Sequence, residues 1–241
     1  MMLLSADADC GKYIDQSITA NCGPVQNHLI AALGPIFWVS MLVYVGVTGL
    51  ILFAAVKYRR RADDEEPRQV HGNTRLELGW TLIPFAILLA LFALTTYEMT
   101  FVKTTPANAM KVCIVGQRYV WVVHYSGTCP APGTLDKANV VVTSGAPPHI
   151  QPMVIPVGKP ISIDLTADDV IHSFYVPTLA GQLNVVPGQM NHMWLQADQV
   201  GTYYGQCTEL CGAGHANMLL EIKVVNQSDY DSWYQKQKAN K

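Results

Sequence analysis

Charged side chains are scarce in this chain of 241 residues. Only 14% of the residues are Asp, Glu, Lys or Arg, and the formal net charge is −2. A protein that binds nucleic acid through bulk charge carries a clear basic excess, so the composition excludes that class. The sequence also lacks a P-loop, a G-x-S-x-G elbow, an H-E-x-x-H pair and a dinucleotide-binding fingerprint. We therefore expect neither nucleotide chemistry nor a hydrolase of these types.

Charge is missing altogether from two long stretches. Residues 29–56 are 28 consecutive residues without one charged side chain, and residues 78–97 are 20 more. About 20 helical residues cross the roughly 30 Å hydrocarbon core of a bilayer. Pro84 would kink the second helix, which neighbouring helices accommodate. The sequence predicts a two-helix transmembrane hairpin over residues 29–98, preceded by an N-terminal segment of residues 1–28.

The basic residues around these stretches are distributed unevenly. The link of residues 57–77 is rich in them, whereas the N-terminal segment has Lys12 alone. Basic residues favour the cytoplasmic side, so we expect a cytoplasmic link with both termini outside. Residues 1–10 show neither the basic start nor the apolar run of a signal peptide. The basic residues of the link are Lys57, Arg59, Arg60, Arg61, Arg68 and Arg75.

From about Ala109 the pattern changes to short apolar segments separated by Gly and Pro. Ile161, Ile163 and Leu165 alternate with polar neighbours, as in a half-buried strand. Residues 109–226 therefore predict an all-β domain, a β-sandwich or Greek-key barrel. Ser228 is expected to cap a last helix within residues 227–241. The clearest strand candidates are residues 110–115, 119–125, 140–143, 161–165 and 218–225.

The most distinctive segment places five chelating groups within twelve residues: Cys207, Glu209, Cys211, His215 and Met218. Thiolate, imidazole and thioether together favour copper over metals that prefer oxygen ligands. A mononuclear blue-copper site needs only one thiolate, so the second cysteine indicates two bridged copper ions. Such a pair needs one terminal imidazole per metal. His215 supplies one, and His172 is the best candidate for the other.

Two simpler interpretations of Cys207 and Cys211 are also compatible with the sequence, a zinc site and a disulfide. A structural zinc site uses four Cys or His ligands and leaves Met218 without a role. A Cys207–Cys211 disulfide is compatible with an oxidising compartment, but it does not account for His215 and Met218. Copper accounts for all of these groups together.

The other four cysteines lie in the segments expected outside the membrane. Cys10 with Cys22, and Cys113 with Cys129, are possible local disulfides, and we favour the first pair slightly. Four cysteines permit three pairings, so the sequence does not fix the connectivity. Cys113 could equally be a buried free thiol in an apolar strand.

Residues 203–218, Tyr-Tyr-Gly-Gln-Cys-Thr-Glu-Leu-Cys-Gly-Ala-Gly-His-Ala-Asn-Met, resemble the dinuclear copper (CuA) loop of cytochrome c oxidase subunit II. The segment Asp169-Val-Ile-His172-Ser-Phe-Tyr-Val-Pro177 resembles the part of that family that carries its first histidine. The resemblance implies a cupredoxin-like fold for the β domain. It also implies a set of copper ligands, with Glu209 acting through its backbone carbonyl: His172, Cys207, Glu209, Cys211, His215 and Met218.

The same resemblance implies a function and a set of partners. The copper pair would accept single electrons from cytochrome c and pass them to haem in subunit I, where oxygen is reduced and protons are translocated. Other oxidase subunits and membrane lipid are further expected partners. His215 would face the route by which electrons leave. We expect a bacterial plasma membrane with a periplasmic copper domain, or alternatively the mitochondrial inner membrane.

Two glutamates have implied roles beyond the copper. The side chain of Glu209 would help to bind a magnesium ion at the boundary with subunit I. Glu77 corresponds to a residue at the cytoplasmic mouth of a proton path into subunit I. Thr74-Arg-Leu-Glu77 also fits a capping box at the start of the second helix, which by itself explains Glu77.

The sequence departs from the family pattern where electrons are accepted. The usual Gly-His-Gln-Trp-Tyr-Trp reads Gly-Gln-Arg-Tyr-Val-Trp over residues 116–121. Tyr119 therefore matches the tryptophan that receives the electron, and strand alternation is expected to place Trp121 on the same face. Arg118 adds a positive charge beside it. Gln182 and Asn184 also replace the usual lysine and aspartate, which weakens the magnesium assignment.

Electrostatic docking of the electron donor is expected to be weak. From Ala109 onward the chain has nine acidic and eight basic side chains, with Asp168 and Asp169 the best candidates for contact with cytochrome c. That balance favours a donor that is tethered or held in a stable supercomplex.

Three rival functions fit the sequence less well. A copper-storage protein has no reason for two spanning helices of this form. Nitrous oxide reductase shares the copper loop but needs a large His-rich domain beyond 241 residues. Quinol-oxidising relatives lack the copper ligands.

Overall fold

The computed structural model describes residues 10, 20–59, 72–125, 127, 129–130, 140–145 and 151–240. The chain divides into two compact units. One is Ala31–Glu98, and the other combines Met1–Ile30 with Met99–Lys241. Most of the expected link, with Arg60, Arg61 and Arg68, lies outside the described residues, as does Lys12.

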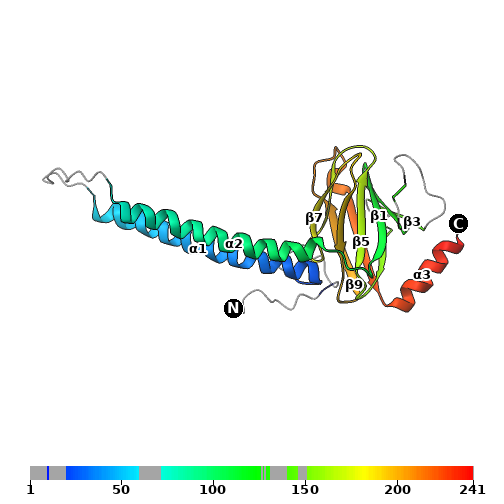
Figure 1. The fold of residues 1–241 in the computed structure, drawn as a ribbon. Coiled ribbons are helices and arrows are strands. Elements are labelled where there is room, and N and C mark those ends of the chain that lie inside the picture. The colour runs from blue at the N-terminus through cyan, green and yellow to red at the C-terminus, as the bar shows by residue number, and fades with distance from the viewer. Residues whose placement is uncertain are drawn as a thin grey trace. The chain divides into compact units, whose positions relative to one another are not determined.

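Two long helices, α1 (Pro24–Lys57) and α2 (Thr74–Lys103), run through the first unit (Figure 1). They contain 34 and 30 residues and so extend beyond the charge-free stretches at both ends. Pro24 occupies the first position of α1, where its missing N–H leaves no bond unmade. Lys57 and Lys103 lie in the last turns, near the negative ends of the helix dipoles.

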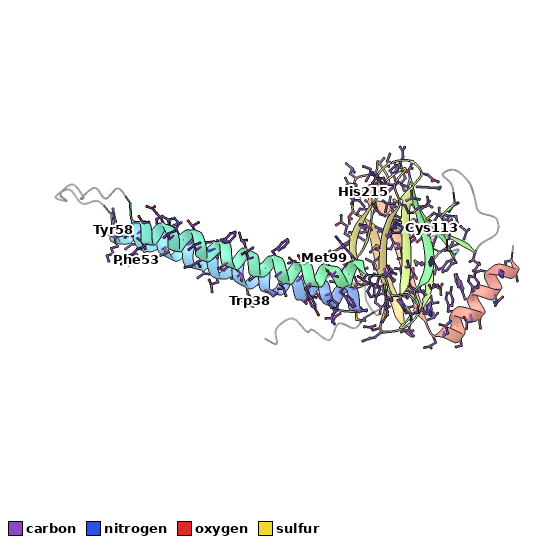
Figure 2. The ribbon with its side chains drawn as sticks, in the orientation of Figure 1. Trp38, Phe53, Tyr58, Met99, Cys113 and His215 are labelled. Atoms are coloured by element: carbon purple, nitrogen blue, oxygen red, sulfur yellow. A yellow bond between two sulfur atoms is a disulfide. The ribbon has the colours of Figure 1, made fainter. Side chains whose placement is uncertain are left out.

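Both helices are long and apolar enough to cross a membrane. Their bulky apolar side chains are exposed rather than packed in a core, among them Leu42 and Val56. Figure 2 shows such side chains projecting along the helices, with Trp38 and Phe53 labelled. A helix that is apolar on all sides is typical of a membrane span. The predicted pair of long apolar helices is therefore confirmed.

The start of α2 differs by one residue from the predicted capping box. Asn73, not Thr74, is the cap, because its Oδ1 accepts hydrogen bonds from the N–H groups of Arg75 and Leu76 at 3.2 and 3.3 Å. Glu77 completes the arrangement by accepting from the Asn73 N–H at 3.2 Å. Asn caps helices at least as well as Thr, which is consistent with the cap at Asn73. The helix-capping role of Glu77 is retained with this different partner.

The second unit is built around two packed five-stranded sheets (Figure 1). One has the order β3-β2-β1-β5-β8 and the other β4-β10-β9-β6-β7. The pairs β1–β5 and β10–β4 are parallel, and the remaining neighbours are antiparallel. The predicted β-sandwich is confirmed. Its strands are β1 (Met110–Gln117), β2 (Val120–His124), β3 (Val141–Ser144), β4 (Met153–Pro156), β5 (Ile161–Ala167), β6 (His172–Val176), β7 (Gly181–Val185), β8 (Asn191–Leu195), β9 (Gly201–Cys207) and β10 (Leu219–Val225).

Large apolar side chains from both sheets fill the space between them. Trp121 from β2 and Phe174 from β6 meet edge to face, with ring centroids 5.7 Å apart. Alternate residues of β5 are fully buried beside them, including Ile163 and Leu165. This core extends to the metal-binding end of the sandwich, because β6 and β9 also carry His172 and Cys207.

Two disulfides tie peripheral segments to the sandwich. Cys10 is bonded to Cys22, and Cys113 in β1 is bonded to Cys129. The favoured Cys10–Cys22 pairing is thus confirmed, and the alternative of a free Cys113 thiol is wrong. Cys22 also joins the sandwich through its backbone, since its N–H donates to Thr178 O at 3.2 Å.

A last helix, α3 (Gln227–Ala239), packs through aromatic side chains. The Tyr125 and Trp233 rings have centroids 5.1 Å apart, and the Tyr230 hydroxyl lies 3.2 Å from Met110 Sδ. The expected Ser228 cap is wrong, because Asn226 occupies the cap position and makes no side-chain cap bond. Aromatic packing of this short helix against the sandwich, rather than a side-chain cap, holds it in place.

Candidate metal centre

The loop between β9 and β10 folds the predicted chelating groups onto one another. β9 ends at Cys207, a short 3₁₀ turn covers His215–Asn217, and β10 begins at Leu219. The base of the loop is closed by a hydrogen bond from the Cys207 N–H to Met218 O at 3.0 Å. Two residues eleven apart in the chain thus become neighbours.

A second strand brings in the distant histidine. His172 is the first residue of β6, which pairs with β9 in the register Phe174 to Cys207. The Thr208 N–H also donates to Ser173 O at 3.2 Å, which fastens the start of the loop to β6. Sheet pairing therefore places His172 beside the cysteines, although 35 positions separate it from Cys207.

The ligand atoms of His172, Cys207 and Cys211 all lie within 4.8 Å of one another. The two Sγ atoms are 3.9 Å apart, and Cys207 Sγ lies 3.9 Å from His172 Nδ1. Cys211 Sγ lies 3.5 Å from His215 Nδ1 and 3.9 Å from Met218 Sδ. The five side chains proposed as copper ligands are thus gathered at one place: His172, Cys207, Cys211, His215 and Met218.

The two thiols are not joined to each other. Both cysteines are free and buried, and their separation is far beyond the roughly 2.05 Å of a disulfide bond. The alternative of a Cys207–Cys211 disulfide is therefore wrong. Figure 2 shows His215 at one end of the sandwich, where the loop lies.

The groups around Cys207 favour its thiolate form in the metal-free protein. Burial alone would raise the pKa of Cys207, but hydrogen bonding to the His172 ring and backbone contacts at Ser173 and Glu209 bring it down to about 6. Burial and the neighbouring Cys207 charge raise the pKa of Cys211 to about 11. Two adjacent thiolates repel each other unless a cation lies between them, so the pair favours a bound metal.

Asp169 fixes the orientation of the His172 ring. Its Oδ1 lies 2.8 Å from His172 Nε2, which leaves Nδ1 facing Cys207 Sγ. Burial would lower the pKa of His172, but its hydrogen bonds with Cys207 and Asp169 outweigh this and raise it. A carboxylate on the outer nitrogen is a common support for a metal-binding histidine. From the sequence, Asp169 was predicted only as a residue that contacts cytochrome c. Its position three residues before His172 could also have indicated a carboxylate that supports this histidine.

Glu209 is divided between two environments. Its backbone carbonyl oxygen lies 3.3 Å from Cys207 Sγ, at the edge of the ligand cluster. Its side chain is exposed to solvent. The carbonyl is thus placed with the ligands, and the carboxylate is free to face a different group. Glu77 belongs to the other compact unit.

The two aromatic residues named for electron uptake have different positions. Tyr119 lies in the turn between β1 and β2, half-buried, and its ring lies against the loop at Gly212 and Gly214. Trp121 is fully buried inside the sandwich, with its ring centroid 6.0 Å from that of His172. The expectation that both lie on one face of a strand is wrong, because β2 begins only at Val120.

The donor set fits copper better than zinc. Two thiols, two imidazoles, a thioether and a carbonyl offer more soft ligands than a tetrahedral zinc site uses. Met218 is fully buried with its sulfur aimed at Cys211, which a zinc site would leave unexplained. The residues present therefore fit a pair of copper ions.

Family models cover most of the chain. The model described as "Cytochrome C oxidase subunit II, periplasmic domain" matches residues 132–225. The model described as "Cytochrome C oxidase subunit II, transmembrane domain" matches residues 15–99. The two matches fall on the β-sandwich and on the helical hairpin respectively.

Individual relatives agree with the family models. Cytochrome c oxidase subunit 2 of Alkalihalophilus pseudofirmus is 38% identical over 203 residues, which are 81% of this chain and 54% of that protein. The probable cytochrome c oxidase subunit 2 of Rickettsia bellii is 30% identical over 221 residues, covering 87% and 79%. This chain thus spans about half the length of the first relative and most of the second.

A solved structure supports the fold of the β domain. The crystal structure of the periplasmic domain of subunit II of cytochrome oxidase from Bradyrhizobium japonicum matches with a TM-score of 0.50 and 30% identity. The match covers 57% of this chain and 99% of that one. The cupredoxin-like architecture predicted for the β domain is confirmed by this likeness.

Proposed function

This chain belongs to the cytochrome c oxidase subunit II family, and from that premise we propose that it accepts single electrons from cytochrome c at a dinuclear copper (CuA) centre and passes them to haem in subunit I. The observation that carries the proposal is the pair of free thiols, Cys207 and Cys211, with Sγ atoms 3.9 Å apart. The proposed ligands are these thiols with His172, His215, Met218 and the carbonyl of Glu209.

When bound, the copper pair would share one electron between two metals, so that little rearrangement accompanies reduction. The protein side of this task is rigidity. His172 and Met218 are fully buried, and both cysteines are nearly so. Ligands anchored on two paired strands and a closed loop hold their positions, because packed interiors resist displacement.

Tyr119 is the proposed point of electron uptake. Its half-buried ring covers the loop that joins Cys211 to His215, so it offers an aromatic contact between a docked donor and the ligands. Trp121 is too deeply buried to touch a donor, and its proposed part is to pack against His172 from inside.

The remaining roles concern the partner subunits. His215, less buried than His172, is the proposed ligand on the side from which electrons leave. The exposed carboxylate of Glu209 is proposed to hold magnesium at the boundary with subunit I. We also propose that Glu77 lies at the mouth of a proton path. In the whole enzyme, oxygen would be reduced to water with proton translocation.

The membrane arrangement follows from charge. The excess of basic residues in the link 57–77 supports a cytoplasmic link, with both termini and the copper domain outside. The two disulfides support an oxidising compartment for the domain that carries the centre. A bacterial plasma membrane with a periplasmic domain is the proposed location, with the mitochondrial inner membrane as the alternative.

Metal analysis of the full-length chain tests the proposal. The chain is purified in detergent, loaded with copper or zinc in competition, and washed free of loosely bound metal. We expect two coppers per chain and no retained zinc. A single copper, or zinc held in preference to copper, would contradict the proposal.

A further inference from the structure

Both oxygens of the Asp169 carboxylate are engaged, and they face different groups. Oδ1 lies 2.8 Å from Nε2 of His172 and accepts from the Val170 N–H at 2.7 Å. Oδ2 accepts from the Arg118 backbone N–H at 2.8 Å and from Arg118 Nε at 3.3 Å. A guanidinium and a ligand imidazole therefore share one carboxylate.

We propose that Arg118 is a positioning residue for the copper centre, which acts through Asp169 to set the electron-donating strength of the His172 imidazole. The inference rests on the proposed function, because it requires copper at His172. Among the hydrogen bonds of the described residues, those of Arg118 run to Asp169 and not to a proposed ligand.

The physical basis is competition for the lone pairs of one carboxylate. A carboxylate paired with a cation is a weaker acceptor toward its other partner. With Arg118 in place, the Asp169 carboxylate accepts a weaker hydrogen bond from the Nε2–H of His172. The imidazole then donates less electron density through Nδ1. A weaker donor stabilises the oxidised centre less, so Arg118 raises the reduction potential.

The direct effect of the charge has the same sign. Removal of a nearby positive charge favours the more positive, oxidised state of the centre. Both effects therefore lower the potential when Arg118 loses its charge. Solvent screens the pair, since the Arg118 side chain is 49% exposed and that of Asp169 is 24% exposed. We accordingly expect a modest change, about threefold in the electron-transfer equilibrium with a donor of fixed potential, or about 28 mV at about 59 mV per tenfold.

A purely structural role for Arg118 predicts a different result. The backbone N–H of residue 118 keeps its bond to Asp169 in every variant, so the turn between β1 and β2 remains anchored. A half-exposed ion pair adds little to stability. If Arg118 only held the turn, its substitution would change the melting temperature and leave the potential unaltered.

The neighbouring residue provides a matched control. Gln117 Nε2 donates to Asp168 Oδ2 at 2.6 Å, so it engages the adjacent carboxylate in the same turn. Among the hydrogen bonds of the described residues, those of the His172 ring run to Asp169 and Cys207 and not to Asp168. The variant Gln117→Ala therefore disturbs the same surface without reaching a ligand.

The experiment compares Arg118→Gln, Arg118→Lys and Gln117→Ala in the full-length, copper-loaded chain in detergent. Redox titration should show a lower potential in Arg118→Gln, a near-normal one in Arg118→Lys, and no change in Gln117→Ala. In the metal-free chain labelled with ¹⁵N-histidine, the Nε2–H proton signal of His172 should move downfield in Arg118→Gln alone.

The outcomes separate this inference from the proposed function. An unchanged potential and an unmoved proton signal in Arg118→Gln, with normal copper content, would overturn the role of Arg118 alone. Failure of the unsubstituted chain to bind two coppers would overturn the proposed function, and the metal-free proton signal would still test the link from Arg118 to His172. An equal shift in Gln117→Ala would also contradict the inference.

Discussion

The ring of Tyr119 lies directly against Gly214 of the metal-binding loop. A Cβ atom on Gly214 would stand 2.5 Å from Tyr119 Cδ2, far inside van der Waals contact. Gly214 has φ of −93°, a conformation that any residue adopts. The aromatic ring, rather than the backbone, therefore explains why this position carries no side chain.

The substitution Gly214→Ala should displace either the ring or the loop. Overpacking of this kind costs about 1–3 kcal/mol in the free energy of unfolding. We expect copper to remain bound and its reduction by cytochrome c to slow. Gly127→Ala is the control, because its Cβ would meet Lys111 only at an ordinary 3.6 Å. Stopped-flow reduction and chemical unfolding measure both effects, and normal reduction in Gly214→Ala would argue against the contact.

Replacement of Tyr119 tests electron uptake itself. Tyr119→Ala removes the aromatic contact and should slow copper reduction by the native donor on the order of tenfold, which corresponds to about 1.4 kcal/mol. Tyr119→Phe keeps the ring and should be close to normal. Transfer from copper to haem, measured after rapid photoreduction, should be unchanged in both.

Salt dependence checks the same site from another side. Arg118 neutralises Asp169 within the turn, so a basic soluble cytochrome should be steered only weakly. A steep fall in the rate with ionic strength, or full-speed reduction in Tyr119→Ala, would show that electrons arrive elsewhere.

The two free thiols should titrate far apart in the metal-free chain. The pKa of Cys207 is lowered to about 6, so its thiolate appears as the pH rises through that value. The pKa of Cys211 is raised to about 11, so at neutral pH it remains a thiol. Iodoacetamide should therefore label Cys207 first, with a midpoint near pH 6, as measured by peptide mass spectrometry.

His172 is responsible for much of this difference, so His172→Ala should move the midpoint for Cys207 upward. The other four cysteines are protected in disulfides and do not confuse the measurement. Equal labelling of both thiols with a common midpoint near that of an ordinary cysteine, about 8.5, would refute the prediction.

Glu209→Gln separates the two environments of that residue. The backbone carbonyl survives the change, so both coppers should be retained. The exposed carboxylate loses its charge, so magnesium or manganese at the subunit boundary should bind more weakly in the assembled oxidase. Metal analysis and manganese resonance measure the two effects, and loss of copper with normal magnesium would reverse the assigned roles.

Much of the site was predictable because its donors follow one another along the chain. Cys207, Cys211, His215 and Met218 lie in a single loop whose chemistry is legible from residue type alone. His172 could be named from the sequence only as the best candidate for the second imidazole, since the pairing of β6 with β9 is what brings it to Cys207. Sheet register is a tertiary property that strand patterns do not reveal.

Strands β4, β7, β8 and β9 are not among the clearest candidates from the sequence. Strand β7, for example, reads Gly-Gln-Leu-Asn-Val, a short pattern with only two apolar side chains. Tyr119 was predicted as the first residue of the apolar segment 119–125, but it lies with Arg118 in the turn that precedes β2. Secondary-structure propensity is a property of single residues, whereas turns and helix caps depend on the hydrogen bonds that neighbouring residues make.

Electron paramagnetic resonance of the oxidised, copper-loaded chain distinguishes a thiolate-bridged copper pair from a single copper ion. If Cys207 and Cys211 bridge two coppers, one unpaired electron is shared, and its hyperfine splitting reports two copper nuclei. The Cys211→Ser variant removes a bridge and should lose that signal while it keeps the fold of the sandwich. We expect the shared signal in the unsubstituted chain only; splitting from a single copper nucleus in that chain would show that the two thiols do not bridge a copper pair.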